Sequence, residues 1–190
     1  MSDRAGRITL TDLVQMKRAG RKFAMLTAYD FPTAAAAQAA GVHSLLVGDS
    51  MGCVLLGHPN TRGVPLDLMV TLAEAVRRGA PRVYLVGDMP YRSMLAGRDG
   101  VLNAAERFRD EAGCDAVKVE CAAGDAPLVA TLAAQGFEVI AHIGLRPQAV
   151  EDAADYRAQA RDPDAIEALA QDARELAHAG AAMLLLEAVP

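Results

Sequence analysis

Residues 43–49 read His-Ser-Leu-Leu-Val-Gly-Asp, and residues 82–88 repeat this plan as Arg-Val-Tyr-Leu-Val-Gly-Asp. In each stretch a short apolar run stops at an acid, Asp49 or Asp88. Four more runs stop in the same way at a residue that can bind metal or move a proton, and these residues are Asp30, Glu120, His142 and Glu187. Short apolar runs bounded by turn residues are typical of buried strands. We therefore expect six strands, at residues 23–29, 43–48, 82–87, 116–119, 138–141 and 183–186.

The segments between these runs repeat one plan, a helical stretch rich in Ala and Leu followed by a glycine. Each glycine is expected to close a helix in the left-handed conformation that Gly adopts without a Cβ clash. These glycines are Gly20, Gly41, Gly79, Gly113, Gly136 and Gly180. Asp67, Asp125 and Asp162 are expected to cap helices, the last with Pro163 at the first helical position. Strands separated by single helices run parallel, so the pattern predicts a repeated β/α chain.

The number of strands leaves the architecture of this single domain, residues 1–190, open. A closed parallel barrel needs eight strands, and the chain stops at Pro190, directly after the sixth run. Three interpretations are open: a fragment of a longer enzyme, a barrel completed by another chain, and an open sheet of six strands. The abrupt stop after the sixth strand favours a truncated barrel. A helix expected at residues 10–18 would cover the amino-terminal end of a barrel.

The composition excludes several classes of function. Hydrophobic residues make up 52% of the chain and aromatic residues 4%, which favours helices packed on buried parallel strands. The net charge is −5 and no long basic cluster occurs, so we expect no nucleic-acid partner. The chain has neither a signal peptide nor an apolar run of membrane-spanning length, so we expect a cytoplasmic protein with no membrane partner.

The polar residues at the strand ends are expected to meet, because the carboxyl ends of parallel strands lie on one face, where such folds place their chemistry. Asp49, Asp88 and Glu120 would then form a cluster of carboxylates that suits a hard cation such as Mg²⁺. The glycine before each aspartate leaves room for a ligand. The alternative is that each acid caps a helix or pairs with a nearby arginine. Three acids in matching positions favour the metal site.

Lys118 and Glu120 lie two residues apart on the fourth run, so both side chains face the same side of the sheet. Val117 and Val119 would then face the helices. A lysine that points into a barrel is costly unless it meets an anion. We expect that anion to be a substrate carboxylate; the alternative is a structural pair with Glu120 or Asp88.

The remaining candidates have separate roles. His142 would donate a hydrogen bond to a carbonyl or enolate oxygen, although a lone histidine at a strand end is often structural. Glu187 has apolar neighbours, so burial is expected to raise its pKa and to suit it as a general base; the alternative is an ordinary strand-end acid. Ser50 lacks the spacing of a nucleophile elbow, and we interpret it as a binding hydroxyl. Asp30 is expected only to fix the loop after its strand.

Seven stretches of the chain, spread along its length, carry a resemblance to a known family. They include Leu-Thr-Ala-Tyr-Asp at 26–30, Val-Lys-Val-Glu at 117–120 and His-Ile-Gly-Leu-Arg-Pro-Gln at 142–148, with residues 46–52, 75–81, 87–90 and 184–190. In this order they are similar to the ketopantoate hydroxymethyltransferase family. That family forms (β/α)₈ TIM barrels, is related to phosphoenolpyruvate mutase and isocitrate lyase, and assembles as a homo-oligomer. The resemblance implies a TIM barrel of which six strands are present here.

The resemblance also implies an enzyme and roles for the candidate residues. Asp49, Asp88 and Glu120 would bind the metal, directly or through water. The substrate-binding residues would be Asp49, Ser50, Asp88, Lys118 and His142. The proton acceptor would be Glu187. The implied reaction moves a hydroxymethyl group from 5,10-methylenetetrahydrofolate to 3-methyl-2-oxobutanoate through a Mg²⁺-stabilised enolate. Its product would be 2-dehydropantoate, an intermediate of pantothenate synthesis.

Two segments depart from the family's pattern. Residues 153–160 read Ala-Ala-Asp-Tyr-Arg-Ala-Gln-Ala where the family carries a glycine-containing segment, and residues 60–65 read Asn-Thr-Arg-Gly-Val-Pro instead of Ser-Thr-Leu-Pro-Val-Thr. The altered segment 153–160 supports one alternative, a related Mg²⁺-dependent 2-oxo acid lyase or mutase. The absence of a seventh and an eighth strand supports the other, a truncated, non-catalytic paralogue that binds a keto acid. Retention of every candidate catalytic residue argues against the second.

Overall fold

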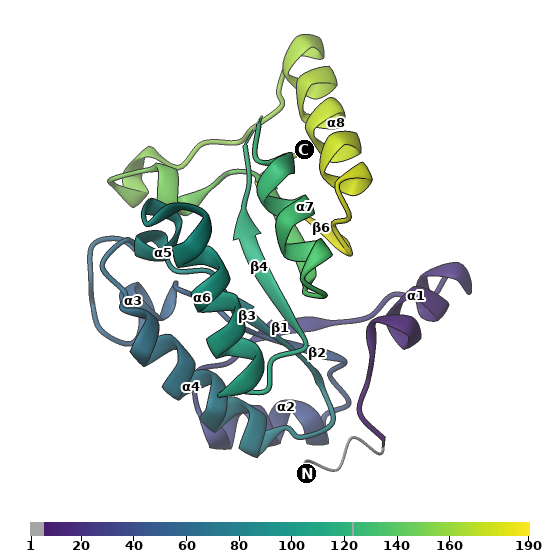
Figure 1. The fold of residues 1–190 in the computed structure, drawn as a ribbon, viewed down its shortest axis with the longest axis vertical. Helices are drawn as coiled ribbons and strands as arrows, with labels where there is room; N and C mark the ends of the chain where they lie inside the picture. The colour runs from purple at the N-terminus through teal and green to yellow at the C-terminus, as the bar shows by residue number, and fades with distance from the viewer. Residues whose placement is uncertain (1–5, 123) are drawn as a thin grey trace.

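Six parallel strands form one sheet in the computed structural model, which describes residues 6–122 and 124–190. The strands are β1 (Met25–Thr27), β2 (Ser44–Val47), β3 (Tyr84–Asp88), β4 (Ala116–Glu120), β5 (Glu138–Gly144) and β6 (Met183–Glu187). They lie side by side in sequence order, and every neighbouring pair is parallel. The sheet curls into an open half-barrel (Figure 1). The predicted β/α chain is confirmed; residues 1–5 and 123 of the expected domain lie outside the described ranges.

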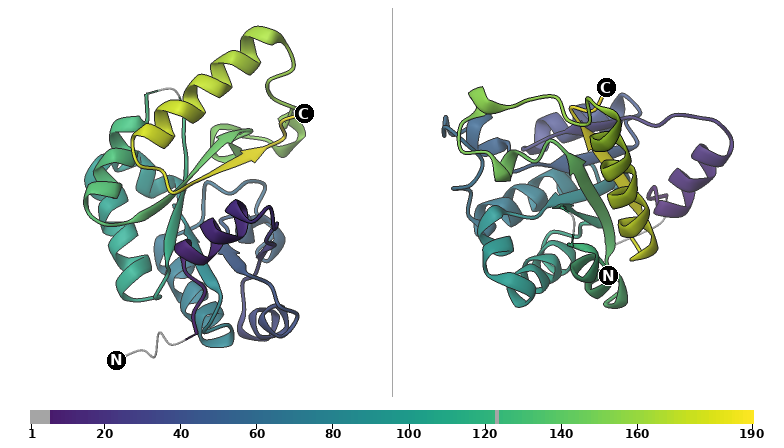
Figure 2. Two further views of the ribbon diagram at one scale, coloured as in Figure 1. Left: turned by 90° about the vertical axis from the view of Figure 1, so that its right-hand side faces the viewer. Right: turned by 90° about the horizontal axis from the view of Figure 1, so that it is seen from above.

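Helices that connect the strands cover the outer face of the sheet (Figure 2). These helices are α2 (Phe31–Ala39), α3 (Met51–Val54), α4 (Leu66–Gly79), α5 (Tyr91–Leu95), α6 (Gly97–Asp110), α7 (Ala126–Ala134) and α8 (Pro163–His178), with 3₁₀ turns at Pro147–Ala149 and Ala153–Asp155. A further helix, α1 (Leu10–Arg18), precedes β1. Apolar side chains of α2, α4, α6 and α7 share one core with alternate strand residues, among them Leu45, Val117 and Val139. Among the described residues, no helix is long and apolar enough to span a membrane.

The inner face of the sheet carries the other half of the strand residues. Near the amino-terminal strand ends, Tyr84, Ala116 and Ile140 pack with Leu13 and Met16 of α1 in a second core. The expected helix therefore covers the amino-terminal end of the half-barrel, as its position in the sequence predicts. The carboxyl-terminal end of the same face is left for polar side chains.

Five of the six glycines expected to close helices have positive φ angles, namely Gly20, Gly41, Gly113, Gly136 and Gly180. The prediction is wrong for Gly79, which lies in the last turn of α4. A Cβ there would come within 2.4 Å of the Phe31 carbonyl oxygen and 3.0 Å of the Ala34 Cβ. Gly79 therefore allows close contact between α4 and α2, a requirement set by the fold and not by the local sequence.

Two of the three predicted helix caps also differ from expectation. Asp162 does cap α8, since its carboxylate accepts a hydrogen bond from the first turn of the helix at 2.9 Å. Asp67 lies inside the first turn of α4, because Pro65 occupies the N-cap position. Asp125 occupies the N-cap of α7, but its carboxylate accepts a hydrogen bond from the preceding Ala122 N instead of from the helix.

Candidate active site

The seven candidate side chains line a single cavity of about 360 Å³ at the carboxyl end of the half-barrel. They are Asp49, Ser50, Asp88, Lys118, Glu120, His142 and Glu187. The strand register explains part of this, because Asp88 lies opposite Lys118, and Glu120 lies opposite His142. The remaining polar strand end, Asp30, caps α2 by accepting a hydrogen bond from the backbone of its first turn at 2.7 Å.

Lys118 is a buried cation between carboxylates. Its Nζ lies 2.7 Å from Asp88 Oδ1 and 3.4 Å from His142 Nδ1. Burial alone would lower the pKa of Lys118, but the nearby carboxylates, Asp88 foremost, outweigh burial and raise that pKa. Lys118 is therefore charged at neutral pH. The pair with Asp88, weighed above as an alternative, does exist, and it forms part of the cavity wall.

Three buried carboxylates share this one lysine. Burial raises the pKa of Asp49 to about 7, and repulsion by Asp88 adds to the effect. Burial likewise raises the pKa of Glu120 to about 8. The backbone N–H of Asp49 donates a hydrogen bond to Asp88 Oδ2 at 3.0 Å, which keeps two of the acids adjacent. When all three acids are ionised, the site holds more negative charge than Lys118 compensates, and this excess favours a cation.

The donor atoms fit Mg²⁺, although they do not form a ready-made chelate. Within residues 6–122 and 124–190, no group of three or more His, Cys, Asp or Glu side chains is arranged to hold a metal ion by itself. Asp88 faces Lys118, whereas Asp49 and Glu120 both accept hydrogen bonds from Gln148. Mg²⁺ usually keeps several waters and needs only one or two carboxylates. Hard oxygen donors with uncompensated charge therefore suit a Mg²⁺ ion bound partly through water.

Glu187 and His142 face each other across the side of the site. His142 lies inside β5, which continues past its predicted end to Gly144. The His142 Nε2 is 3.1 Å from Glu187 Oε2. The Glu187 side chain is 41% exposed, and the contact with His142 lowers its pKa, so the predicted rise in that pKa is wrong. Burial does not set the direction of this pKa shift because β6 is an outer strand of the sheet. Among the described strands it pairs only with β5.

Sequence reasoning missed Gln148, which is 4% exposed and bridges two of the acids. Its Nε2 donates to Asp49 Oδ2 at 2.8 Å, and its backbone N donates to Glu120 Oε2 at 3.0 Å. Sequence reasoning also missed Thr61 and Tyr156, which line the cavity from two long loops. Gln148 belongs to the stretch 142–148 that carries the family resemblance, which marks its position but not its contacts. The two loop residues lie in the segments 60–65 and 153–160 that depart from the family's pattern, but nothing in the sequence distinguishes them from their neighbours there.

One of the two unusual segments contacts the other long loop at the cavity rim. Arg62 Nη1 lies 3.1 Å from Glu151 Oε1, and Asn60 Nδ2 donates to the Glu151 carbonyl oxygen at 3.2 Å. The Arg62 guanidinium also lies 4.4 Å from the centre of the Tyr91 ring. The residues at 60 and 62 therefore join the loop after β2 to the loop after β5 on either side of the cavity.

The half-barrel resembles several solved structures. A phosphonopyruvate hydrolase, solved with oxalate and Mg²⁺, has a TM-score of 0.71 and 14% identity, covering 94% of this chain and 63% of that chain. A 2,3-dimethylmalate lyase of the phosphoenolpyruvate mutase/isocitrate lyase superfamily has a TM-score of 0.66 and 18% identity, covering 95% of this chain and 62% of that chain. The chain therefore shares its fold with these proteins over the part of them that it covers.

The sequence places the chain in one family. Residues 7–190 match the family model of ketopantoate hydroxymethyltransferase. The 3-methyl-2-oxobutanoate hydroxymethyltransferases of Geobacillus kaustophilus and Carboxydothermus hydrogenoformans are 44% and 45% identical over 95% and 97% of this chain. The chain spans 64% of the length of the first relative and 67% of the second. It belongs to the ketopantoate hydroxymethyltransferase family.

Proposed function

We propose that this chain carries the 2-oxo acid site of a 3-methyl-2-oxobutanoate hydroxymethyltransferase, on strands that belong to one barrel domain. The enzyme would transfer a hydroxymethyl group from 5,10-methylenetetrahydrofolate to 3-methyl-2-oxobutanoate and release 2-dehydropantoate. Family membership and the names of the relatives support this function. The observation that carries it is the single cavity in which four carboxylates, Lys118 and His142 meet.

The cavity offers a place for the carboxylate of a 2-oxo acid and for the negative charge that develops on its keto oxygen. Lys118, kept charged by its carboxylate neighbours, supplies the positive charge. The Ser50 hydroxyl supplies a hydrogen bond, and its contact with Tyr29 OH at 2.9 Å helps to fix its direction. Leu46 and Leu185 line the same cavity and suit the branched aliphatic end of the substrate.

Glu187 is the proposed acceptor of the proton on C3 of the substrate. Its contact with His142 lowers its pKa, so the carboxylate is ionised and able to take a proton at neutral pH. His142 also holds the carboxylate beside the cavity, whose lining includes both residues. Loss of the C3 proton leaves an enolate, which would form the new carbon–carbon bond with the methylene carbon of the folate. The two C–N bonds of that carbon break, water supplies the hydroxyl oxygen, and tetrahydrofolate leaves.

Asp49, Asp88 and Glu120 are the proposed holders of Mg²⁺. When bound, the ion would draw electron density from the keto and carboxylate oxygens of the 2-oxo acid and so make the C3 proton more acidic. The carboxylates supply hard oxygen donors and the net negative charge that suits a divalent cation. The raised pKa values of Asp49 and Glu120 mean that protons compete with the cation near neutral pH.

Exchange of the substrate C3 proton tests this proposal. The purified chain is mixed with MgCl₂ and 3-methyl-2-oxobutanoate in D₂O, and loss of the C3 proton signal is followed by NMR. We expect exchange, and we expect Glu187→Gln to slow it by about 10²–10⁴-fold, the usual contribution of a general base. Glu138→Gln is the matched control, because Glu138 pairs with Tyr84 at the opposite end of the sheet.

Addition of 5,10-methylenetetrahydrofolate separates the remaining possibilities. Formation of 2-dehydropantoate supports the full transferase reaction. Exchange without product supports the 2-oxo acid site alone. Binding of the keto acid without exchange would indicate a non-catalytic keto-acid-binding protein, and a folded chain that neither binds nor exchanges the keto acid would contradict the proposal.

A further inference from the structure

Gln148 connects the ends of three strands. It lies in the 3₁₀ turn Pro147–Ala149, which follows β5. Its Nε2 donates hydrogen bonds to Asp49 Oδ2, after β2, and to the Met89 carbonyl oxygen, after β3, both at 2.8 Å. Its backbone N donates to the two carboxylate oxygens of Glu120, at the end of β4, at 3.0 and 3.3 Å. A single residue after β5 therefore reaches the carboxyl ends of β2, β3 and β4.

The chemical type of Gln148 matters as much as its position. An amide donates hydrogen bonds but carries no charge, so it holds a carboxylate in place without cancelling the negative charge. Lys118 already compensates one charge of the cavity. A second cation at position 148 would remove the excess negative charge that favours a divalent ion. A neutral donor is therefore the side chain that orients these acids and leaves them able to bind a cation.

Gln148 reaches the proposed chemistry only through its neighbours. Among the described residues, those that line the cavity include Pro147 but not Gln148. Asp49 and Glu120, which do line it, stand at the ends of β2 and β4, and these strands are separated by β3. The two acids have no direct strand pairing to fix their spacing. Gln148 is the group that both of them contact.

We propose that Gln148 is a positioning residue that sets the spacing and orientation of Asp49 and Glu120 for binding of a divalent cation. This inference rests on the proposed function, since it treats the two acids as metal ligands. Residues behind a metal ligand commonly orient that ligand and so control the affinity for the metal. Removal of the amide donors frees the Asp49 carboxylate and the Met89 carbonyl oxygen, and the loss of these two bonds loosens the turn whose backbone holds Glu120.

Calorimetric titration of MgCl₂ into the purified chain, with no substrate present, tests the inference. Gln148→Met keeps the length of the side chain and removes both donors. We expect it to weaken Mg²⁺ binding by about 10- to 100-fold, the usual effect of losing such a group. Gln148→Asn keeps an amide on a shorter stem, and we expect a smaller loss. At saturating Mg²⁺, the rate of C3 proton exchange in Gln148→Met should return toward the wild-type rate.

Gln38→Met is the matched control. The Gln38 side-chain oxygen accepts a hydrogen bond from Arg82 N at 2.8 Å, just before β3 at the opposite end of the sheet. This variant also loses a glutamine hydrogen bond, and we expect its melting temperature to fall while its Mg²⁺ affinity stays at the wild-type value. A purely structural role for Gln148 would lower the melting temperature in the same way and leave Mg²⁺ affinity unchanged.

The outcomes separate this inference from the proposed function. Equal Mg²⁺ affinity of the wild type and Gln148→Met overturns the inference and leaves the proposed function standing. An equal loss of affinity in Gln38→Met also overturns it, because a general loosening of the fold would then be the cause. Absence of Mg²⁺ binding by the wild type overturns both. If Gln148→Met does not fold, Gln148→Asn decides: weaker binding supports the inference, and unchanged binding overturns it.

Discussion

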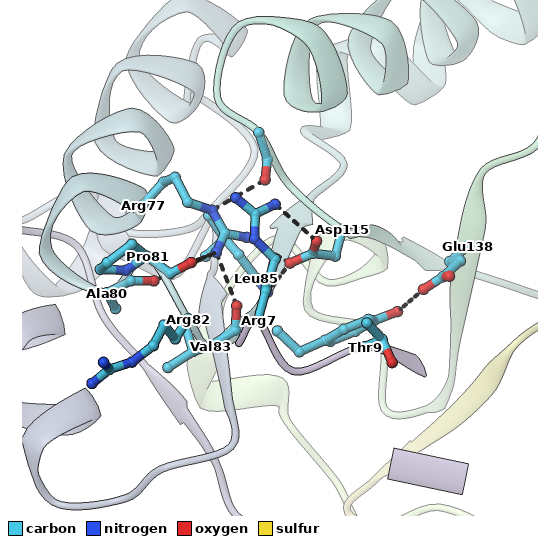
Figure 3. Close-up of polar contacts among 12 residues, drawn as sticks. Arg7, Thr9, Arg77, Ala80, Pro81, Arg82, Val83, Leu85, Asp115 and Glu138 are labelled. Atoms are coloured by element: carbon cyan, nitrogen blue, oxygen red, sulfur yellow. Dashed lines mark hydrogen bonds and ion pairs between the residues drawn. The ribbon is translucent and has the colours of Figure 1, made fainter. Parts of the chain in front are cut away.

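The two ends of the sheet handle buried charge in opposite ways. At the amino-terminal end, one acid lies between two cations: Asp115 is 2.5 Å from Arg77 Nη2 and 3.3 Å from Arg7 Nη1 (Figure 3). At the carboxyl-terminal end, three buried carboxylates share Lys118. Cations exceed acids in the first network, and acids exceed cations in the second. The contrast indicates that the first network holds the fold and that the second is arranged for a ligand.

Arg77 and Asp115 of the amino-terminal network also form hydrogen bonds with the backbone. Arg77 also donates to the carbonyl oxygens of Gly113 and Val83 at 3.1 and 2.9 Å, and Asp115 accepts a hydrogen bond from Leu85 N at 2.8 Å. Figure 3 shows these groups joining the end of α4 to the segments around β3 and β4. Charged groups that are hydrogen-bonded to the backbone in this way stabilise the fold. The unmatched acids at the other end have raised pKa values and remain available to bind an ion.

Arg77→Met gives the largest expected loss of stability. The variant keeps an apolar stem but removes one of the two cations beside Asp115 and leaves the Gly113 and Val83 carbonyl oxygens without the guanidinium donor. Removing one partner of a buried ion pair costs about 3–5 kcal/mol. We expect the free energy of unfolding, measured by urea denaturation, to fall by that amount. Exchange of the substrate C3 proton per folded molecule should stay at the wild-type rate, and a loss of exchange would show that the two ends are not independent.

Lys118→Met makes the equivalent change at the carboxyl-terminal end. Among the described residues Lys118 forms one ion pair, with Asp88, whereas Arg77 also donates to the Gly113 and Val83 carbonyl oxygens, so we expect a smaller loss of stability than in Arg77→Met. Exchange should fall by about 10²–10³-fold, because a group that stabilises developing negative charge is gone. Urea denaturation and NMR measure the two effects. Retained exchange in folded Lys118→Met would make Lys118 a structural cation like Arg77.

The inward position of Lys118 could be predicted because strand geometry is local. Alternation puts Lys118 and Glu120 on one face and Val117 and Val119 on the other, and the structure places both valines in the outer core. Parallel direction likewise predicts that polar residues at the strand ends reach one edge, where the candidate side chains do line one cavity. These predictions need only a period of two and a common strand direction.

Features that depend on distant segments could not be predicted from the sequence. Gln148 is 99 residues from Asp49, and no local pattern links them. The direction of the Glu187 pKa shift depends on His142 and on the exposure of the outer strand. Gly79 was assigned the wrong role because its constraint comes from the approach of α4 to α2. In each case the role of the residue depends on a contact between two elements that are distant in the sequence, and no local sequence pattern predicts how these elements pack.

The pH dependence of stability sharpens the contrast between the two ends. Burial raises the pKa of Asp49 to about 7 and that of Glu120 to about 8, whereas acids in an unfolded chain titrate near about pH 4. The folded, metal-free chain therefore holds more protons in this range, so the stabilisation is complete below about pH 4 and is lost as the pH rises through about 7 and 8. Because the two carboxyls share neighbours, we expect a combined loss smaller than the sum of two independent shifts.

Asp49→Asn tests this origin of the pH dependence. The variant removes one of the two titrating groups, so the unfolding free energy measured by urea denaturation should vary less between about pH 5 and pH 8. Asp30→Asn, which exchanges one N-cap residue for another, is the matched control. Added Mg²⁺ should stabilise the wild type most at the upper end of this range, where protons no longer compete. An Asp49→Asn profile as steep as the wild-type profile would contradict the assignment.

Deletion of one tyrosine hydroxyl at each end gives the smallest expected effects. Tyr84 OH donates to Glu138 Oε2 at 2.5 Å at the amino-terminal end, and Tyr29 OH lies 2.9 Å from Ser50 Oγ at the cavity. Tyr84→Phe leaves a half-buried carboxylate without its donor, so the free energy of unfolding should fall by about 1–2 kcal/mol, with exchange unchanged. Tyr29→Phe should change stability by less than about 0.5 kcal/mol, because Ser50 can turn to another partner.

The effect of Tyr29→Phe should instead appear in the binding of the 2-oxo acid. Ser50 loses the contact that directs its hydroxyl, so the KM for exchange should rise roughly two- to fivefold while kcat stays close to the wild-type value. Both variants delete the same oxygen atom, so a difference between them reports where the hydroxyl lies and not what it is. If Tyr84→Phe raised KM and Tyr29→Phe lowered stability, the division between a fold-holding end and a ligand-binding end would be wrong, and the excess of acids around Lys118 would need another explanation.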